Sequence, residues 1–383
     1  MKKELTIAVI GSGPGGATAA ALLQRAGFRV KVFEQTLHFQ PTGAGIHLTP
    51  NVLKALRPIG ADRYLLERGC RPSAFTSRSW DSGELLFSLS LGDVAEQRYG
   101  GAYLTVHRAD FQQALVAAVE PGSITYGKKL ESLENSAEGV RLRFKDGYEE
   151  VVDLVIGADG LSSRSRQILQ GEDPPTFAGQ VAYRSVFPAS ALKILPTHDL
   201  TKWWAPDRFV IAYYLTRTKD CFYFVAGFPA IKWPHKTRSV AGSLDELLGA
   251  FAGFHPEVRA ILQAGTEVSK WPLFERPPNP VWYRERVVLL GDACHPMSPH
   301  MAQGAAMAVE DAAILTRCLT SVGASNWKQS FQMYTSMRTG RTSRVQAISS
   351  QNRWLREPSD PGWVFDYDVW KEPLPLLEDA IAI

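Results

Sequence analysis

The chain has few cysteines and no long apolar run. Its four cysteines, Cys70, Cys221, Cys294 and Cys318, are widely spaced and show neither paired metal-ligand spacing nor a secreted disulfide framework. This favours a reducing compartment, and we expect a cytoplasmic protein. No stretch approaches the roughly 18 apolar residues of a membrane-spanning helix. The first apolar run meets a glycine loop too early for a signal peptide, so we expect no membrane partner.

Net charge is also small. The 42 Lys and Arg residues against 39 Asp and Glu residues give a formal net charge of +3, which is too near balance for a nucleic-acid-binding surface. A content of 45% hydrophobic and 21% charged residues excludes a disordered or fibrous chain. At roughly 150 residues per domain, 383 residues predict two to three domains. We expect a globular enzyme with a small-molecule partner and no nucleic acid.

The first 35 residues follow a strand, loop, helix, strand pattern. We expect a buried strand at Leu5–Ile10, a helix that ends near Arg25 at the stop residue Gly27, and a second strand at Arg29–Glu34. A short strand, a helix and another strand of this length form a βαβ unit. The chain therefore starts with the beginning of a parallel sheet.

The loop of this unit carries a phosphate-binding pattern. Gly11, Gly13 and Gly16 fit G-x-G-x-x-G after a strand and at the start of a helix. Such glycines allow a tight turn and the close approach of a pyrophosphate to free helix amides. Glu34 follows Gly11 by 34 − 11 = 23 residues, where a carboxylate can bind ribose hydroxyls. The pattern predicts a dinucleotide site and leaves FAD and NAD as alternatives.

The middle of the chain contains short strands. Residues 85–110 and 124–152 alternate in short runs, with a hairpin that turns at Asp146 and Gly147. Val151–Ile156 is expected to return as one strand to the parallel sheet. From about residue 180 to 272 the strands are aromatic, which favours a largely antiparallel sheet. Phe209, Ile211 and Tyr213 should share one face of it, because strand side chains alternate.

The C-terminal third of the chain is expected to return to the nucleotide-binding domain. The apolar strand Val287–Leu290 leads to Gly291 and Asp292, and a long buried helix is expected from about Gly304 to Thr320. We therefore predict an α/β fold, in which a discontinuous Rossmann-like nucleotide-binding domain has a parallel sheet and a substrate domain has a mainly antiparallel sheet. The first domain should comprise residues 1–75, 100–178 and 274–340, the second 76–99 and 179–273, followed by a C-terminal segment at 341–383.

Two later motifs discriminate between the cofactors. Gly157-Ala158-Asp159-Gly160 follows one strand, and a second motif places Asp292 just past another strand, with Gly304 beyond it. With the first loop, these residues resemble the class A flavin-dependent aromatic hydroxylases. The resemblance implies FAD held by the first loop and Glu34. It also implies Asp292 at the ribityl chain of the flavin, Arg108 near the pyrophosphate and Asp159 in a turn that positions the loops. A surface ion pair for Arg108 and a simple turn for Asp159 are the alternatives.

The resemblance narrows at residues 43–51 and 295–304, together with the short segments 202–204, 207–208 and 213–214, which begin with Lys202, Asp207 and Tyr213. These segments are similar to the 6-hydroxynicotinate 3-monooxygenase family over nearly the full chain. That family hydroxylates and decarboxylates 6-hydroxynicotinate to 2,5-dihydroxypyridine, and His47, Tyr213 and His300 match its active-site residues. Leu200 and Phe209 depart from it, because they stand where a cysteine and a histidine are found.

The chemistry of ring hydroxylation needs a base at the ring hydroxyl, since loss of that proton makes the ring carbon electron-rich. His47 has a suitable ordinary pKa, Tyr213 can relay or hold the proton, and His300 can donate to a carboxylate or hydroxyl. Isolated histidines are more often packed or surface residues, and Tyr213 could serve the core alone. The resemblance favours the catalytic roles.

The leading hypothesis is an FAD-dependent monooxygenase that uses O2 and NADH or NADPH on a small aromatic or pyridine carboxylate. A salicylate-type hydroxylase, a flavin oxidoreductase without oxygen insertion and a non-enzymatic FAD-binding protein are the alternatives. No second complete glycine motif follows a strand, so NAD(P)H would bind transiently at the FAD domain. No zinc or iron ligand set is recognisable. We expect a monomer or a homodimer.

Overall fold

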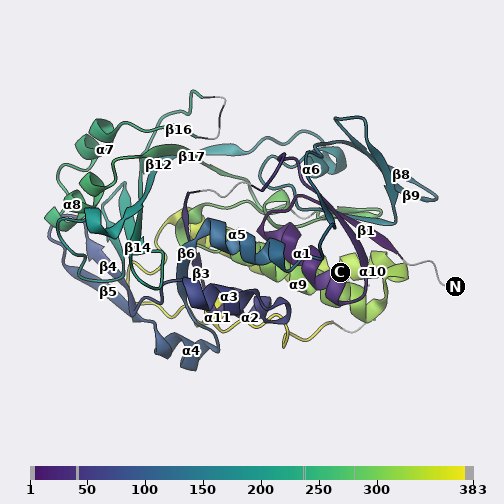
Figure 1. Ribbon diagram of the computed structural model, residues 1–383, viewed down its shortest axis with the longest axis horizontal. Coiled ribbons are helices and arrows are strands. Elements are labelled where there is room, and N and C mark those ends of the chain that lie inside the picture. Colours follow the sequence, from purple (N-terminus) through teal and green to yellow (C-terminus); the bar gives the residue numbers. More distant parts are fainter. Residues whose placement is uncertain (1–4, 40–42, 236, 238, 280, 376–383) are drawn as a thin grey trace.

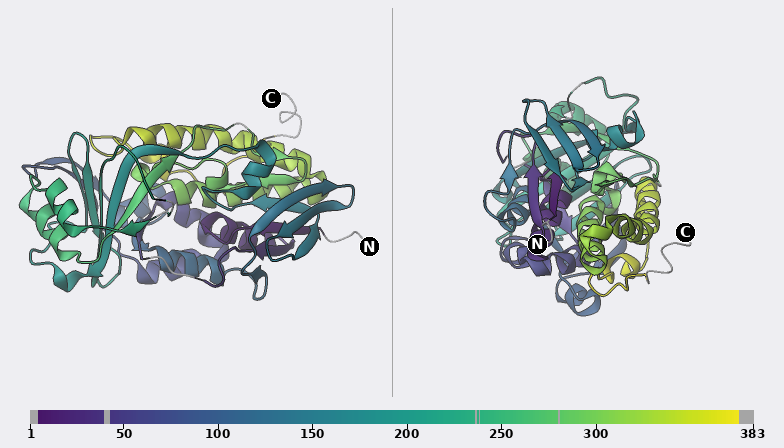
Figure 2. Two further views of the ribbon diagram at one scale, coloured as in Figure 1. Left: turned by 90° about the horizontal axis from the view of Figure 1, so that it is seen from above. Right: turned by 90° about the vertical axis from the view of Figure 1, so that its right-hand side faces the viewer.

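The computed structural model describes residues 5–39, 43–235, 237, 239–279 and 281–375. The molecule is elongated, with a parallel sheet and its long helices in one part and a large antiparallel sheet in the other (Figures 1 and 2). The chain crosses between the two parts several times, as the sequence of colours along the ribbon shows (Figure 1). A surface where the two parts meet can therefore receive residues from distant stretches of sequence.

The parallel part is built around the buried strand that precedes the glycine loop. Three of the five parallel strands of the sheet, Thr6–Ile10, Leu154–Gly157 and Val287–Leu289, are apolar and almost wholly buried, as expected where both faces of a parallel sheet are covered. A short antiparallel strand completes one edge. The six strands lie in the order β18 (Tyr283–Arg284), β19 (Val287–Leu289), β11 (Leu154–Gly157), β1 (Thr6–Ile10), β2 (Arg29–Phe33) and β7 (Ile124–Thr125).

The second part is an eight-stranded sheet. All its neighbouring strands are antiparallel except β13 and β4, which run parallel. Its order is β16 (Val240–Ala241), β17 (Ser269–Glu275), β12 (Thr176–Pro188), β15 (Cys221–Pro229), β14 (Phe209–Tyr214), β13 (Leu200–Trp204), β4 (Ala74–Ser79) and β5 (Leu85–Ser90). Both sheets agree with the predicted fold class, which is confirmed, whereas the domain boundaries stay a prediction.

Two smaller sheets complete the fold. A three-stranded sheet of β8 (Leu130–Ser136), β9 (Gly139–Phe144) and β10 (Glu149–Val152) contains the predicted hairpin turn. A pair of strands, β3 (Gly45–Leu48) and β6 (Leu104–His107), lies next to the start of helix α5 (Arg108–Ala117). This pair carries His47 on one strand and leads into Arg108 on the other.

The helices cover the sheets. Helix α1 packs on α9, and α9 packs on α10, beside the parallel sheet (Figure 2). Helices α7 and α8 pack on each other at the far end of the large sheet. The helices are α1 (Pro14–Arg25), α2 (Pro50–Leu56), α3 (Ala61–Arg68), α4 (Asp93–Tyr99), α5 (Arg108–Ala117), α6 (Arg164–Gln170), α7 (Leu244–Ala250), α8 (Pro256–Ala264), α9 (Gly304–Val322), α10 (Trp327–Gln351) and α11 (Gly362–Phe365).

Two local predictions are wrong. Val151–Ile156 is not one strand, because the chain bends at Asp153 between β10 and β11. The Asp153 carboxylate accepts a hydrogen bond from the Thr6 amide at 2.8 Å, and its own amide donates to the Thr6 carbonyl at 2.9 Å. Residues 85–110 also include helix α4, whose Gly92 and Gly100 flank it with positive φ angles.

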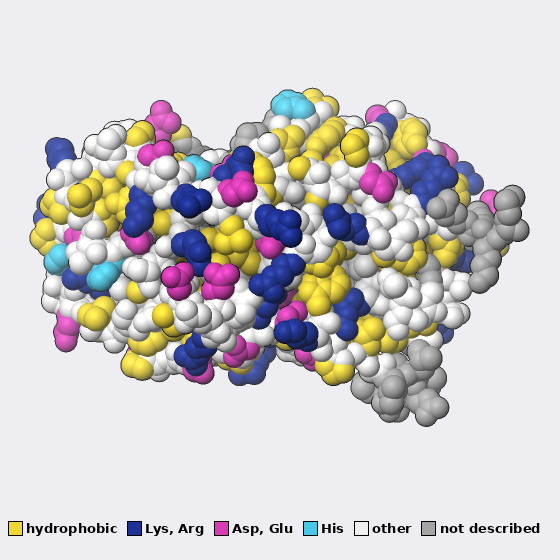
Figure 3. Space-filling view, turned by 60° about the horizontal axis from the view of Figure 1, so that its bottom comes forward, with side chains coloured by type: hydrophobic (Ala, Val, Ile, Leu, Met, Phe, Trp, Pro, Cys, Tyr) yellow, Lys and Arg dark blue, Asp and Glu magenta, His cyan; other side chains and the backbone are white. Residues whose placement is uncertain are grey.

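The surface agrees with the small net charge. On the face shown in Figure 3, Lys and Arg side chains are interspersed with Asp and Glu rather than gathered into a band. Among the residues that the structure describes, no helix has both the length and the apolar character needed to cross a membrane. The last residues of the predicted C-terminal segment, 376–383, lie outside the described residues.

Candidate active site

A cavity of about 970 Å³ lies where the two parts of the molecule meet. Its walls come from the loops after β1, β11 and β19, from the start of α9, and from one face of β13, β14 and β15. The carboxyl ends of parallel strands are the usual place for a nucleotide in such sheets. The volume is at the upper end of the range for small-molecule sites, about 300–1,000 Å³.

The three predicted glycines have different roles in the first loop. Gly11 has a φ of +98°, and a Cβ there would lie 2.6 Å from the Ala158 carbonyl oxygen. A Cβ at Gly16 would lie 2.0 Å from the Gly11 carbonyl oxygen, so both glycines allow backbone segments to pack closely. A Cβ at Gly13 would meet no protein atom within 4 Å, and Gly13 lines the cavity. Only Gly13 of the three therefore leaves open space for a bound group.

This loop fits the pyrophosphate of a dinucleotide. Gly13 is the N-cap of α1, so its position supplies no side-chain cap to the amides of the first turn. Uncapped amides at the start of a 12-residue helix attract an anion. Glu34 also lines the cavity and accepts hydrogen bonds from the Ser12 amide at 2.8 Å and the Ser12 hydroxyl at 3.0 Å. Its carboxylate therefore braces the glycine loop beside the space that a ribose would occupy.

Asp159 stabilises the turn before α6. Its carboxylate accepts hydrogen bonds from the Ser163 hydroxyl at 2.5 Å and from the Ser165 amide at 2.9 Å. Burial raises the pKa of Asp159, although these hydrogen bonds oppose the shift. Asp159 lines the cavity, so its geometry suits a residue that fixes the loop around a ligand.

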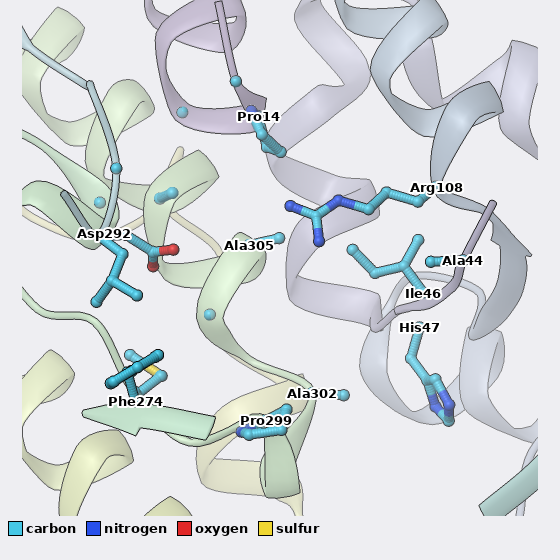
Figure 4. A pocket seen from close by; sticks show the side chains of 18 of the residues that line it. Pro14, Ala44, Ile46, His47, Arg108, Phe274, Asp292, Pro299, Ala302 and Ala305 are labelled. Atoms are coloured by element: carbon cyan, nitrogen blue, oxygen red, sulfur yellow. The ribbon is translucent and has the colours of Figure 1, made fainter. Parts of the chain in front are cut away.

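Arg108 and Asp292 stand on opposite walls of the cavity. Their side chains point toward one another, with Ala305 between them (Figure 4). Burial lowers the pKa of Arg108, and the charge of Asp292 opposes that shift. Arg108 is the first residue of α5, and its amide donates to the Ala44 carbonyl at 2.8 Å. Arg108 thus faces the cavity rather than making the surface ion pair that was its alternative.

A buried ionic network supports the loop that carries Asp292. Asp311 accepts hydrogen bonds from the Gly291 amide at 3.1 Å and from the Arg338 guanidinium at 2.7 Å, and it lies 2.6 Å from His295 Nε2. Arg338 also donates to Glu310 at 2.8 Å. Burial alone would raise the pKa of Asp311, but His295 and Arg338 hold it below its usual value. His295 therefore serves the loop and does not line the cavity.

His47 lies at the other end of the cavity from the glycine loop, beyond Ile46 when seen from Pro14 (Figure 4). Its Nδ1 is 2.6 Å from the Tyr103 hydroxyl. Tyr213 meets the imidazole edge to face, with ring centroids 4.3 Å apart. The hydrogen-bond partner of His47 is therefore Tyr103, which the sequence analysis did not single out, while Tyr213 is a ring contact.

Burial and the charge of Lys202 lower the pKa of His47 from 6.5 to about 3. The same two causes lower the pKa of His300 to about 3, and burial raises the pKa of Tyr213 well above 10. Both imidazoles and the phenol are thus neutral at neutral pH. A neutral imidazole is the form that can accept a proton.

His300 stands on a short 3-10 helix, Pro299–Met301, and meets the edge of Phe209 at 5.2 Å between ring centroids. Its Nδ1 is buried with no hydrogen-bond partner among the described residues. Buried polar atoms normally have a partner. His300 lines the cavity, and its buried Nδ1 does not open into that space.

The structure places ten of the eleven predicted site residues on one cavity, namely Gly11, Gly13, Glu34, His47, Arg108, Asp159, Tyr213, Asp292, His300 and Gly304. Gly16 packs beneath the loop. Lys202 carried part of the resemblance without a predicted role, and sequence reasoning missed Tyr103, Arg184 and the C-terminal residues Trp354, Leu355 and Phe365, which all line this cavity. Nothing in the local sequence marks them, because each meets the site through distant contacts.

The FAD binding domain family matches residues 4–349. The chain belongs to this FAD-binding family. It is 48% identical over 376 residues to a 6-hydroxynicotinate 3-monooxygenase of Pseudomonas fluorescens, with 98% of both chains covered. It is also 48% identical to the protein of that name from Bordetella bronchiseptica, again over 98% of both chains. A salicylate hydroxylase substrate complex has a TM-score of 0.83 at 26% identity and covers 97% of each chain.

The family confirms the predicted class of enzyme and cofactor. The chain is an FAD-dependent aromatic monooxygenase, whose reaction partners are an aromatic substrate, O2 and NAD(P)H. The geometry fits FAD, since Gly13 leaves room at the uncapped start of α1 and Arg108 and Asp292 face each other farther along the cavity. The roles of individual residues stay predictions.

Proposed function

We propose that this enzyme hydroxylates a hydroxylated pyridine or benzene carboxylate with loss of CO2, and that 6-hydroxynicotinate is its substrate. The observation that carries the proposal is the buried neutral His47 between two phenols, at the end of an FAD-sized cavity. The relatives named 6-hydroxynicotinate 3-monooxygenase support the choice of acid.

The reaction balances with one reductant and one O2. The 6-hydroxynicotinate anion, NADH, O2 and two protons give 2,5-dihydroxypyridine, CO2, NAD+ and water. One oxygen atom bonds to the ring carbon that carries the carboxylate, and the other leaves as water. The bond to the carboxylate then breaks, its electron pair returns to the ring and aromaticity is restored.

Bound FAD supplies hydride acceptance from NAD(P)H and the activation of O2. The residues that would hold it are those at the cofactor end of the cavity. Gly13 and the start of α1 would face the pyrophosphate, with Arg108 as a further cation. Glu34 would meet a ribose, Asp292 the ribityl chain, and Gly304 at the start of α9 would lie against the flavin.

His47 would take the proton from the ring hydroxyl. A neutral imidazole has one N–H, so base catalysis requires the tautomer in which Nδ1–H donates to Tyr103 and Nε2 carries the lone pair. Tyr103 then fixes the tautomer and the ring orientation. Tyr213 closes the other side of the imidazole with its ring and brings a neutral hydroxyl to the cavity.

The proposed reaction also suggests a division of labour between the domains. We propose that residues 1–75, 100–178 and 274–340 bind FAD and that 76–99 and 179–273 supply the wall on which the substrate lies. The enzyme would act in the cytoplasm, where NAD(P)H is available, as a monomer or a homodimer.

A salicylate-type hydroxylase is the second candidate, favoured by Leu200 and Phe209. Leu200 is opposite Tyr213 in the sheet, and Phe209 is opposite Trp204 on the same face, so apolar side chains stand at both positions where the resemblance expects a cysteine and a histidine. The purified holoenzyme, NADH and each of 6-hydroxynicotinate, salicylate and 4-hydroxybenzoate separate these candidates when NADH loss and CO2 release are followed together. Matched NADH loss and CO2 release with 6-hydroxynicotinate support the proposal. Matched release with salicylate alone favours the second candidate, and NADH loss without a hydroxylated product from any acid contradicts both.

A further inference from the structure

Lys202 is a buried cation in the wall of the cavity. It lies in the middle of β13, is 3% exposed and lines the cavity. It pairs across the sheet with Ile211, which also lines the cavity. Because strand side chains alternate, Lys202 projects from the same face of the sheet as the Leu200 and Tyr213 pair.

Aromatic rings and one amide surround the ammonium group. Its Nζ is 3.6 Å from the centroid of the Trp204 ring and 4.6 Å from that of Phe209. It donates a hydrogen bond to the Asn352 side-chain oxygen at 2.9 Å. No salt bridge to Lys202 is found among the described residues, and burial lowers its pKa well below 10.5. Burial of a charge without a counter-ion costs free energy. An anion bound next to Lys202 would therefore stabilise the charged form of its side chain.

Within the described part of the chain, no carboxylate of the cavity wall is placed to be that anion. The acidic residues of the cavity wall are Glu34, Asp159 and Asp292, and all three belong to loops of the parallel sheet. Around Lys202 the titratable neighbours His47 and His300 are neutral. This end of the cavity therefore favours an anionic ligand.

Asn352 holds the ammonium group in place from another element. It is the C-cap of α10, in the left-handed conformation with φ 48° and ψ 45°, which asparagine tolerates better than most residues. Trp354 and Leu355 follow it into the cavity wall. The end of α10 thus fixes the position of Lys202 and closes the same end of the cavity.

We propose that Lys202 binds the carboxylate of the substrate and selects aromatic acids over neutral rings. This inference rests on the proposed function. The Lys202 and Ile211 pair is two residues along the strands from the Leu200 and Tyr213 pair, or about 6.6 Å at 3.3 Å per residue. The ammonium group leans farther along the same face, over Trp204 and Phe209, so a ring whose hydroxyl meets His47 and Tyr213 directs the carboxylate on its opposite side toward Lys202.

A carboxylate-binding Lys202 would also favour release of the product. The substrate is an anion that pairs with Lys202, whereas loss of CO2 leaves a neutral dihydroxylated ring without that pairing. His300, whose ring meets the edge of Phe209, adds a neutral polar side chain to the same end of the cavity. The product therefore binds more weakly than the substrate.

Calorimetric titration of the holoenzyme without NADH tests the proposal. The two ligands are 6-hydroxynicotinate and its neutral amide, 6-hydroxynicotinamide. In Lys202→Met we expect the acid to bind at least about tenfold more weakly, while the amide binds as it does to the wild type. Lys270→Met is the matched control, because Lys270 lies in the same sheet but pairs with Glu246 outside the cavity wall, and it should leave both affinities unchanged.

Lys202→Met should keep its FAD and its melting temperature, since an apolar side chain replaces a buried cation. If Lys202→Met loses FAD, the Asn352→Ala variant is tested instead. It keeps the charge of Lys202 but removes the hydrogen bond that holds the ammonium group in place. A loss of acid binding with unchanged amide binding supports the proposal there too. Equal affinity for the acid in a folded variant and the wild type overturns it. If the wild type binds neither ligand but binds another class of aromatic compound, the proposed function fails instead.

Discussion

His47 and Tyr213 meet edge to face at 4.3 Å between ring centroids, with their planes at 80°. His47 stands on β3 beside the start of α5, and Tyr213 stands on β14 of the eight-stranded sheet. The contact therefore joins the small strand pair next to the cofactor loops to the sheet on which the substrate would lie. It places His47 at the point where, in our proposal, the flavin and the substrate have to meet.

Replacing His47 by Gln should lower substrate-dependent hydroxylation by about 10²–10⁴-fold, as expected for the loss of a general base. Flavin content should stay near normal, because His47 lies at the far end of the cavity from the glycine loop. Product formation and flavin absorbance are measured on the same samples. Normal turnover in His47→Gln would remove His47 from the mechanism and shift the base to His300 or water.

Tyr103→Phe and Tyr213→Phe separate two kinds of support for the base. Tyr103→Phe removes the hydrogen bond to Nδ1 and should lower hydroxylation only where His47 is present, since residues that act as a unit are non-additive. Tyr213→Phe keeps the ring contact and tests the hydroxyl alone. The double variants with His47→Gln give the coupling. Losses that simply multiply would show that the tyrosine concerned acts independently of His47.

Gly13→Val should abolish or strongly weaken FAD binding while the chain still folds. The Gly13 backbone is extended, with φ −62° and ψ −179°, which valine tolerates, and its side chain would fill the open space that the pyrophosphate needs. Gly249→Val is the matched control, because Gly249 in α7 also has open space and lies away from the cavity. Flavin absorbance per protein and circular dichroism give the result. Full flavin retention in Gly13→Val would contradict the loop assignment.

Acid should destabilise the fold partly through His47 and His300. Their pKa values fall from 6.5 to about 3 on folding, so between these values the unfolded chain binds more protons. Stability is then lost as pH falls from 6.5 toward 3, by at most about 1.4 kcal/mol per pH unit for each histidine. Urea unfolding of the holoenzyme measures its free energy of unfolding at pH 7 and at pH 5.5. The decrease in this free energy between the two pH values should be about 1 kcal/mol smaller in His47→Gln than in wild type. Identical drops would argue against a neutral buried His47.

The buried network of Glu310, Asp311 and Arg338 should contribute strongly to the free energy of unfolding. Arg338 is fully buried and bonds both Glu310 and Asp311, so Arg338→Met leaves two carboxylates short of a cation and should cost about 3–5 kcal/mol. Arg344→Met on the same helix is the control, because Arg344 is exposed and stacks on Trp363. Denaturant midpoints measure both. A loss of less than about 1 kcal/mol in Arg338→Met, within the range of a surface pair, would refute this role.

Much of the cofactor end could be predicted because its signals are local. Gly11, Gly13 and Glu34 belong to one strand, helix, strand unit, and Asp292 directly follows a strand of the same sheet. Alternation alone placed Phe209 and Tyr213 on one face, and both line the cavity. In these cases the backbone period or a short motif carries the information.

The substrate end could not be predicted in the same way. Tyr103 reaches His47 across 56 residues of sequence, and Asn352 reaches Lys202 across 150. Similarly, the break at Asp153 depends on Thr6, 147 residues away. Such partners are brought together by the packing of the two sheets and of α10, which no spacing in the sequence records.

The central claim is that the holoenzyme inserts one atom of O2 into a hydroxylated aromatic acid and releases its carboxylate. Turnover of 6-hydroxynicotinate with NADH under 18O2, with mass analysis of the ring product and of CO2, tests it directly. We expect 2,5-dihydroxypyridine that carries one 18O atom, with CO2 and product formed in equal amounts and matched by the NADH consumed. Consumption of NADH that yields only hydrogen peroxide, or a product without the label, would contradict the account.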